Sequence, residues 1–396
     1  MSLSNRPIYS LPSLKTYMSH ISLPQAQTHT LLQNYQNTPR KAFQSPTANL
    51  RTEWATSTTA LPTLQVLQKY QQAKIPFSNL YLHYSRHHVG TLNARELWEY
   101  LVVSKEVGAQ GESGSKRRGI LSDQDESLAA RYRIDFGRGI SAEEEEEDER
   151  IKKWQGRTPS GGRGGTCTLN NTFFGTVMRS FGMDVVSTGA RVALAVQGGP
   201  KGKFFGWNHL INLVRFEGRM FLVDVGFGGT GPTAPIEVVD GNEVPWGITK
   251  DRNRLIYSTI PEFTSPTSKC WIMQHRTEGQ TKWDDMYCFT QSEFLPQDIA
   301  VMAFKTTGDL RGSFFNHVLF CGRNLLAEGE VVGRLDLVGG RLRRRLRGME
   351  TEMEVVESEV ERWEILEREF GIVLGDEERG GIRGLVTELR GRPKRG

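Results

Sequence analysis

The sequence predicts an α+β fold, because helical and strand-like patterns occupy separate parts of the chain. Up to about residue 104, apolar residues recur mainly at helical spacing. From residue 183 to about 287, short runs of alternating β-branched and aromatic residues are separated by Gly and Pro. The last hundred residues mix strand-like runs with one helical pattern. No internal repeat is found, and this order does not resemble alternating βαβ units.

Size and composition restrict the class of protein. The 396 residues are enough for two or three domains, each with its own core. The net charge of +4, from 50 basic and 46 acidic side chains, argues against nucleic acid as the main partner. We find no apolar signal-peptide region and no membrane-spanning run, so a cytoplasmic protein is expected. The four cysteines form no CxxC pair, so neither a disulfide framework nor a metal site is expected.

In the N-terminal part, helices are expected over 61–74 and 93–103, separated by an extended, aromatic-rich segment at 75–85. From residue 105 to about 162 the sequence becomes polar, with charge blocks of both signs. Such a composition is typical of a mobile surface insertion.

The strand-like runs and the last helix can be placed more closely. The helix is expected within 354–371, where Val356, Val360, Trp363, Leu366 and Phe370 form one apolar stripe that ends at Gly371. The clearest strand-like segments are 185–196, 209–216, 219–227 and 253–260, and further strands are expected at 316–326 and 333–346.

Cys167 ends the segment GGRGGTC at 161–167 and opens a helical pattern that continues to Gly182. At the first turn of a helix, free backbone N–H groups and the positive end of the dipole favour a thiolate. The flanking glycines would let backbone approach a ligand closely and leave N–H groups for an oxyanion. An inert buried cysteine beside a flexible loop is the alternative, and this segment alone does not decide between them.

A hairpin is predicted over 207–228, with Glu217-Gly218 as its two-residue turn. Residues whose numbers add up to 435 then face each other, so Ile211 is opposite Asp224. His209 lies on the same face as Ile211, diagonal to Asp224 at about 7–8 Å between Cα atoms. An imidazole and a carboxylate can close that gap.

Asp224 interrupts the apolar run FLVDVGF, where an unpaired carboxylate would be very costly. His209 is the available partner. Cys167, His209 and Asp224 would then act as nucleophile, base and orienting acid. A thiolate activated in this way attacks acyl carbonyls of amides, esters or thioesters.

Three other motifs resemble binding motifs, but none of them is favoured as a binding site. GFGGTG at 226–231 matches a dinucleotide-binding pattern, but Pro232 and Pro235 leave no helix to receive a pyrophosphate, so a turn is expected. A single RGG at Arg163 is too little for RNA binding. The basic run 341–347 could contact coenzyme phosphates, although a solvated basic strand is favoured.

The segment RGGTCTLNN at 163–171 resembles the RGG-x-C motif of the arylamine N-acetyltransferases. WNHLINLV and FLVDVGFG resemble the histidine and aspartate segments of that family, in the same order. IPFSNLYLHYS resembles its N-terminal PF-x-NL stretch and REFGIVL the end of its C-terminal helix. The resemblance runs from about Ile75 to Leu374, and an insertion at 105–162 is of a kind found in fungal members.

The resemblance implies a helical bundle, an antiparallel β-barrel and an α/β lid, with a catalytic core like that of cysteine proteases. Residues 1–182 would be the helical domain, 183–290 the barrel and 291–396 the lid. The implied activity is ping-pong acyl transfer from acetyl-CoA, or from malonyl-CoA, to an arylamine or hydrazine, as in the modification of foreign amines. No permanently bound cofactor, metal, nucleic acid or membrane is implied. The implied site residues are Cys167, His209 and Asp224 for catalysis and Phe227, Gly228 and Ser313 for substrate binding.

Two positions depart from the family pattern. Leu169 and Ser78 stand where the family usually has glutamate. These departures leave open a weakly active binding homologue, and the same triad would also serve a hydrolase or a transglutaminase-type enzyme. A malonyl donor would require a pocket cation, Arg163 or another, for its second carboxylate. The sequence does not indicate the oligomeric state.

Overall fold

The computed structural model describes residues 6–37, 58–103, 161–347 and 349–391. The predicted insertion at 105–162 lies outside these ranges except for Gly161 and Gly162. Its expected mobility therefore stays a prediction.

The described part of the chain is α+β, as predicted, with most of the N-terminal helices before the strands. The helices and helical turns are α1 (Leu11–His20), α2 (Gln25–Asn37), α3 (Ala60–Lys74), η3 (Leu80–Leu82), α4 (Ala94–Trp98), η4 (Glu99–Val103), α7 (Cys167–Ser180), η5 (Leu194–Gln197), α8 (Pro296–Gly308), η6 (Phe314–Asn316), α9 (Glu359–Phe370) and α10 (Asp376–Gly381).

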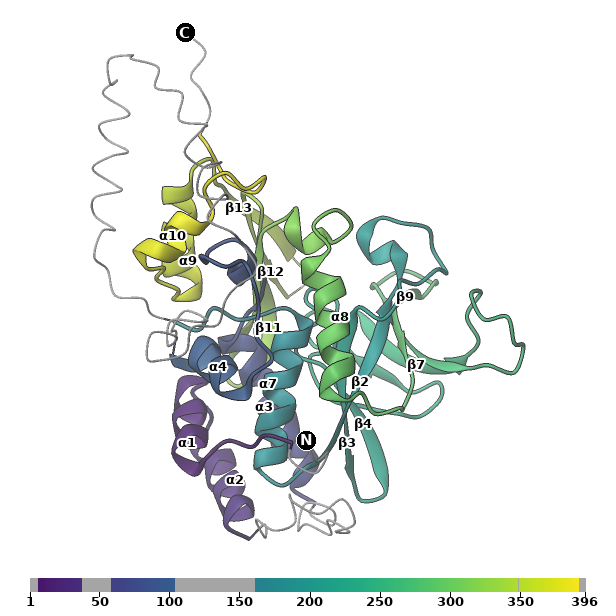
Figure 1. The fold of residues 1–396 in the computed structure, drawn as a ribbon. Helices are drawn as coiled ribbons and strands as arrows, with labels where there is room; N and C mark the ends of the chain where they lie inside the picture. The colour runs from purple at the N-terminus through teal and green to yellow at the C-terminus, as the bar shows by residue number, and fades with distance from the viewer. Residues whose placement is uncertain (1–5, 38–57, 104–160, 348, 392–396) are drawn as a thin grey trace, which may run out of the picture.

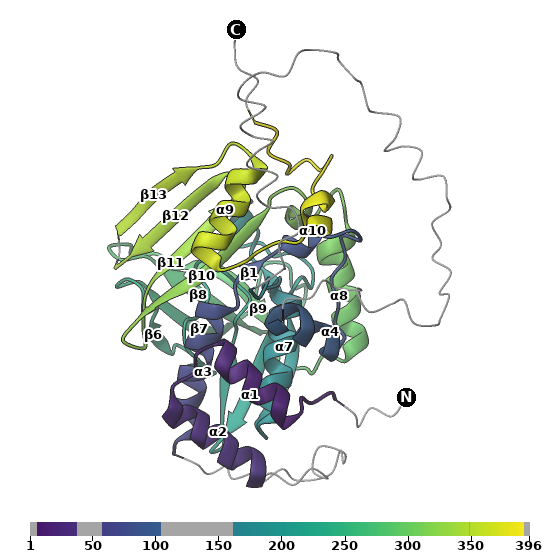
Figure 2. The same ribbon diagram turned by 90° about the vertical axis from the view of Figure 1, so that its left-hand side faces the viewer.

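The strands form two antiparallel sheets. The larger, in the order β5-β4-β3-β2-β9-β8-β7-β6, is the barrel-like sheet in Figure 1, and the smaller has the order β1-β10-β11-β12-β13 (Figure 2). The strands are β1 (Phe77–Ser78), β2 (Asp184–Val192), β3 (His209–Phe216), β4 (Arg219–Val223), β5 (Ile236–Glu237), β6 (Glu243–Pro245), β7 (Arg252–Ser258), β8 (Cys270–Arg276), β9 (Asp284–Phe289), β10 (Phe320–Ala327), β11 (Glu330–Val338), β12 (Arg341–Leu346) and β13 (Met349–Val355).

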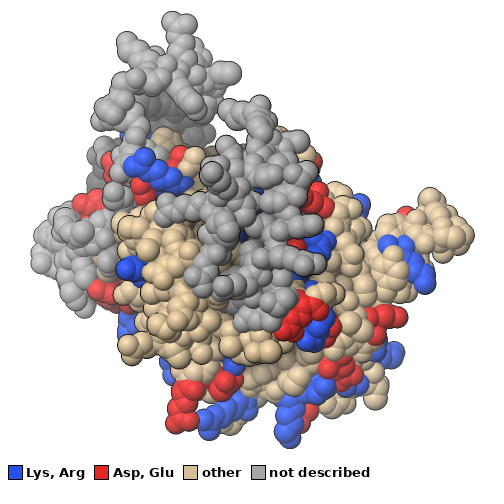
Figure 3. Space-filling model, turned by 90° about the horizontal axis from the view of Figure 1, so that it is seen from below, with Lys and Arg blue, Asp and Glu red and all other residues tan. Residues whose placement is uncertain are grey.

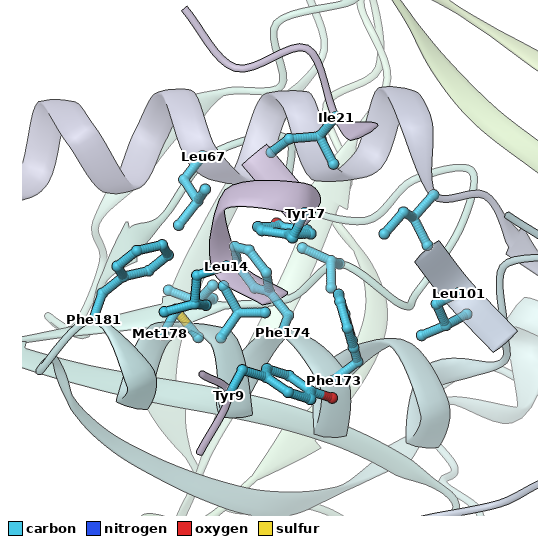
Figure 4. Packing of buried hydrophobic residues seen from close by; sticks show 14 of the residues in the cluster. Tyr9, Leu14, Tyr17, Ile21, Leu67, Leu101, Phe173, Phe174, Met178 and Phe181 are labelled. Carbon is cyan, nitrogen blue, oxygen red and sulfur yellow. The ribbon is translucent and has the colours of Figure 1, made fainter. Parts of the chain in front are cut away.

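Helix α7 is the centre of the N-terminal core. Phe173, Phe174 and Met178 are fully buried, and their cluster includes Tyr17 of α1 and Leu67 of α3. Figure 4 shows these side chains meeting between the three helices. On its other side α7 contacts β2 and β3 of the larger sheet. The residue at the start of α7 is therefore held by packing along the whole helix.

The smaller sheet is covered on one face by α9 (Figure 2). Leu335, Leu337 and Leu342 of this sheet share a buried cluster with Trp363 and Leu366 of α9. The β11–β12 register places Leu335, Leu337 and Leu342 on the face that α9 covers and the alternate residues on the opposite face.

The helix expected from residue 354 begins later. Residues up to Val355 belong to β13, which pairs with β12, and α9 begins at Glu359. The N-cap Ser358 accepts a hydrogen bond from the Glu361 backbone N–H, and the Glu361 carboxylate accepts one from the Ser358 N–H. This capping box fixes the start of the helix. The end at Gly371, with φ +69°, is as predicted.

On the visible described part of the surface in Figure 3, acidic and basic side chains are interspersed. This mixture agrees with the small net charge of +4. Among the described helices, none has the length and apolar character required to cross a bilayer.

Candidate active site

Cys167 is the first residue of α7. Thr166 before it is extended, and its hydroxyl lies 3.0 Å from the hydroxyl of Tyr81. The Cys167 side chain is only 3% exposed, and its Sγ lies 3.7 Å from the Asn208 carbonyl oxygen. The position at a helix start agrees with the expectation from the sequence. The first N–H groups of the helix have no intrahelical acceptor.

The glycines before Cys167 were expected to let the backbone approach a ligand, but they pack against other backbone segments of the protein. A Cβ on Gly161, Gly162 or Gly164 would lie 1.9 to 2.3 Å from the backbone oxygens of Gly371, Leu101 and Pro76, respectively. These residues lack side chains because the loop packs directly on other backbone segments. The Gly165 N–H also donates to Pro76. The loop is therefore a packed support for α7, and not an open cradle for a ligand.

The predicted hairpin register is confirmed. Leu213 pairs with Leu222 and Phe216 with Arg219 across the Glu217-Gly218 turn. This register brings His209, at the start of β3, next to Asp224, just after β4. The His209 Nε2 lies 2.8 Å from Asp224 Oδ2. Both side chains are buried, at 2% and 1% exposure.

Electrostatics favour a charged pair at this point. Burial lowers the pKa of His209, but the charge and hydrogen bond of Asp224, together with Cys167, outweigh burial and raise the pKa to about 10. Burial raises the pKa of Asp224, but His209 and two further hydrogen-bond donors outweigh burial and lower it. An imidazolium–carboxylate pair is thus the favoured state near neutrality. Since Nε2 is bound to Asp224, Nδ1 is the ring nitrogen left for the thiol.

Asn171 of α7 was missed by the reasoning from sequence. Its Nδ2 donates to Asp224 Oδ1 at 2.9 Å and to the Leu210 carbonyl at 2.7 Å, while its Oδ1 accepts from the Val225 N–H at 3.1 Å. The Gly226 N–H also donates to Asp224 Oδ1, at 2.8 Å. Asn171 therefore links the helix of Cys167 to the strands of His209 and Asp224. Its position on the helix, one turn after Cys167, was the available signal.

The turn after Asp224 approaches Cys167 closely. A Cβ on Gly226 would lie 2.6 Å from Cys167 Cα, and one on Gly228, where φ is +92°, would lie 3.0 Å from the Phe77 ring. Phe227 contacts the His209 ring edge-on, with centroids 5.3 Å apart. Segment 224–235 forms turns and no helix, as expected for GFGGTG.

A cavity of about 650 Å³ opens beside Cys167 and lies between the two sheets. Its reactive side is formed by Cys167, Asn208, His209 and the turn 226–230. Its arginine side is formed by Arg334 and Asp336 of β11 and Arg343 and Arg345 of β12. The remaining lining residues are mostly apolar: Phe77, Val192, Val196, Gln197, Phe314, Phe315, Phe320 and Val338.

Of the three predicted substrate-binding residues, two line this cavity and one does not. Phe227 and Gly228 line this cavity. Ser313 is not among the lining residues; its hydroxyl donates to the Thr306 carbonyl and accepts from the Phe315 N–H. It positions the neighbouring Phe314 and Phe315, which do line the cavity. A direct role in binding stays a prediction for all three.

Arg163 cannot serve as the pocket cation suggested from the sequence. It is 1% exposed, and its Nε and Nη2 donate to the two Glu378 carboxylate oxygens at 2.8 and 2.7 Å. The cavity cations are instead Arg334, Arg343 and Arg345, and the last two belong to the basic run 341–347.

Ser78 and Leu169, which stand where the family usually has glutamate, are both buried and packed in this structure. Ser78 donates from its hydroxyl to the Arg163 carbonyl at 2.5 Å. Leu169 is buried in the core around α7. The buried Arg163 charge is matched by Glu378 of α10, so neither missing glutamate leaves it unpaired. Within the described residues, no group of three or more His, Cys, Asp or Glu side chains could hold a metal ion.

The chain is similar to known N-acyltransferases. A family model described as N-acetyltransferase matches residues 158–379. The N-malonyltransferase FDB2 of Fusarium pseudograminearum is 29% identical over 396 residues, which covers 96% of this chain and 94% of that protein. An arylamine N-acetyltransferase / N-hydroxyarylamine O-acetyltransferase of Salmonella typhimurium is 27% identical over 220 residues, covering 55% and 70% of the two chains.

Solved structures share the fold. The arylamine N-acetyltransferase from Salmonella typhimurium superposes with a TM-score of 0.58 at 21% identity, covering 93% of this chain and 94% of that one. That of Mycobacterium marinum, solved in complex with CoA, gives 0.59 at 20% identity, with 95% and 99% covered. The predicted helical, barrel and lid architecture is confirmed by this likeness.

Proposed function

Because this chain belongs to the arylamine N-acetyltransferase family, we propose that it transfers an acyl group from coenzyme A to an arylamine through an acyl-Cys167 intermediate. Membership of this family makes the chain an acyltransferase that acts on amines. We propose in addition that the acceptor is an arylamine, that Cys167, His209 and Asp224 catalyse the transfer, and that the steps follow a ping-pong order. The observation that carries it is the 2.8 Å contact of His209 with Asp224, next to Cys167 at the start of α7. A role in the modification of foreign amines follows from this acceptor class.

In the first step, the Cys167 proton is held on His209 Nδ1, and the Cys167 thiolate attacks the thioester carbonyl of the donor. Asp224 stabilises the imidazolium and holds the ring with Nδ1 toward the thiol. The carbonyl oxygen becomes negative, and N–H groups at the start of α7 would stabilise it. The bond to the coenzyme sulfur then breaks, and the imidazolium returns the proton to the leaving thiolate.

The second step uses the acyl-cysteine, which is also a thioester and so keeps its reactivity. An arylamine is weakly basic and neutral at pH 7, so its nitrogen can attack without first losing a proton. As the N–C bond forms, the bond to Cys167 breaks and His209 takes the amine proton. Mostly apolar lining residues, including Phe227 beside His209, would favour a flat aromatic acceptor over water.

The proposal is tested by measuring coenzyme A release and N-acyl product together, with and without an arylamine. Transfer predicts slow release alone, a large acceleration by the amine, and one amide formed per coenzyme released. Parallel lines in double-reciprocal plots would reflect the ping-pong order. Equal release with and without amine, and no amide, would instead indicate a hydrolase. Cys167→Ala is the control and should do neither.

A further inference from the structure

The charged residues of the active-site cavity lie on one side. Apart from His209, the ionisable groups with a formal charge among the lining residues are Arg334, Asp336, Arg343 and Arg345, which all belong to β11 and β12. Three arginines against one aspartate give this side a surplus of positive charge. The reactive side opposite contributes backbone, the thiol and the imidazole. The cavity is thus electrostatically asymmetric.

The strand register determines this placement. Arg345 pairs with Arg334 and Arg343 with Asp336, so the four side chains belong to the same face of the sheet. The other face carries Leu335, Leu337 and Leu342, which are buried under α9. Burial of the leucines therefore fixes the arginines on the cavity face, and a shift of one residue would exchange the two sets.

Arg334 and Asp336 largely neutralise each other. The Arg334 Nε lies 2.8 and 3.0 Å from the two Asp336 carboxylate oxygens, and its Nη1 donates to Asn324 Oδ1 at 3.1 Å. Arg343 and Arg345 are the other two cations of this side. Both also have contacts of their own in the folded chain, and the Arg345 guanidinium lies over the Trp246 ring, 5.8 Å from its centroid. Since a guanidinium has five N–H donors, an arginine that already has a partner can still bind an anion.

We propose that Arg343 and Arg345 bind the free carboxylate of the acyl group, so that the donor class is a coenzyme A half-thioester of a short dicarboxylic acid. The proposal rests on the acyl transfer proposed above and names its donor. Arginine matches a carboxylate in planar, two-pronged geometry. An acetyl group offers nothing for these cations to bind. The N-malonyltransferase FDB2, whose sequence aligns along 96% of this chain, bears a name of the same donor class.

With such a donor, the two transfer steps form and break the same bonds as in the proposed function. The Cys167 sulfur bonds to the thioester carbon, the carbon–sulfur bond of the donor breaks, and coenzyme A leaves with the proton from His209. The acyl-cysteine keeps its carboxylate against Arg343 and Arg345. Attack by the amine breaks the bond to Cys167 and releases an amide that carries one free carboxylate.

The test compares malonyl-CoA with acetyl-CoA, using one arylamine, in Arg343→Gln, Arg345→Gln and the double variant. Charge-assisted hydrogen bonds of this kind predict a loss in kcat/KM for malonyl-CoA of about 10-fold for each change and about 100-fold for both. With acetyl-CoA the change should be about twofold or less. Transfer from acetyl-CoA also shows that each variant is folded. Arg341→Gln is the matched control, since Arg341 is on the same strand but outside the cavity lining.

Two results would overturn the proposal while leaving the proposed function intact. Equal losses with both donors would mean that the arginines bind the coenzyme phosphates that the donors share. Unchanged kcat/KM with both donors would mean that they bind no part of the donor. If the parent protein transferred neither acyl group to any arylamine, the proposed function itself would be wrong and this inference would fall with it.

Discussion

The two sides of the cavity differ in how firmly their functional groups are held. On the reactive side, Cys167 and His209 are buried, and their partner Asp224 accepts hydrogen bonds from the ring, from Asn171 and from Gly226. On the arginine side, exposure increases outward from the buried Arg334 to the half-buried Arg345 and the exposed Arg343. The groups that we propose to react are therefore buried, whereas two of the three cavity arginines are more exposed.

This difference predicts two kinds of mutational effect. Changes on the reactive side should alter the rate with every donor, because they move the reacting atoms. Changes on the arginine side should alter the choice of donor and leave the chemical step intact, because exposed charges can be replaced without repacking. The following predictions test this separation, from the largest expected effect to the smallest.

Asp224→Asn should reduce acylation by about 10⁴-fold with malonyl-CoA and acetyl-CoA alike, by analogy with amidation of a triad acid. The asparagine fills the same volume but cannot stabilise the imidazolium. Single-turnover release of coenzyme A measures the effect. A parent-like rate with either donor would remove Asp224 from the site and would mean that another acid holds His209.

Glu378→Gln should lower the free energy of unfolding by about 3–5 kcal/mol, because Arg163 would be left as a buried, unpaired charge. Urea denaturation followed by circular dichroism is the measurement. Glu330→Gln is the matched control; Glu330 pairs with Lys69 but its side chain is 73% exposed, so a change of about 1 kcal/mol or less is expected. Equal losses in the free energy of unfolding would show that the buried Arg163–Glu378 pair stabilises the protein no more than an exposed pair does.

Asn171→Ala should lower kcat by about 100-fold with both donors and leave KM nearly unchanged, because Asp224 and the turn after it would lose their link to α7. Asn170→Ala is the control. Asn170 is equally buried but donates to the Pro76 carbonyl, so it should cost stability and little rate. If kcat fell equally in the two variants, Asn171 would have only a structural role and would not position Asp224.

The His209–Asp224 pair should also shape stability against pH. The His209 contribution is complete below the unfolded pKa of 6.5 and is lost as pH rises through about 10. The Asp224 contribution is present above 3.8 and is lost as pH falls through its lower folded pKa. Thermal unfolding from pH 6.5 to 10 should therefore show a fall in stability that is smaller in Asp224→Asn. Parallel curves for the two proteins would argue against a charged pair.

The sequence predicted best what is local. A two-residue turn and period-two alternation were enough to set the β3–β4 register and to bring His209 to Asp224. The helix at Cys167 followed from its apolar spacing. The pairing of Arg163 with Glu378 could not be predicted, because the two residues are 215 positions apart and share no pattern.

The basic run on β12 shows a second limit. The sequence of 333–346 predicts strands, but only packing decides which face of the sheet α9 covers. That choice places Arg343 and Arg345 in the lining of the cavity that Cys167 also lines, and it cannot be read from composition or spacing. The start of α9 was also predicted too early, because the apolar stripe continues into residues that belong to β13 and its connection.

The central claim is that Cys167 carries the acyl group, and intact mass spectrometry tests it most directly. After mixing with acyl-CoA in the absence of amine, the protein should gain the mass of one acyl group, 42 Da being about the increment for acetyl and 86 Da about that for malonyl. Peptide mapping should place it on Cys167, and an arylamine should remove it as the N-acyl product. A stable adduct on Cys270, Cys288 or Cys321, or no adduct while amide still forms, would contradict the account.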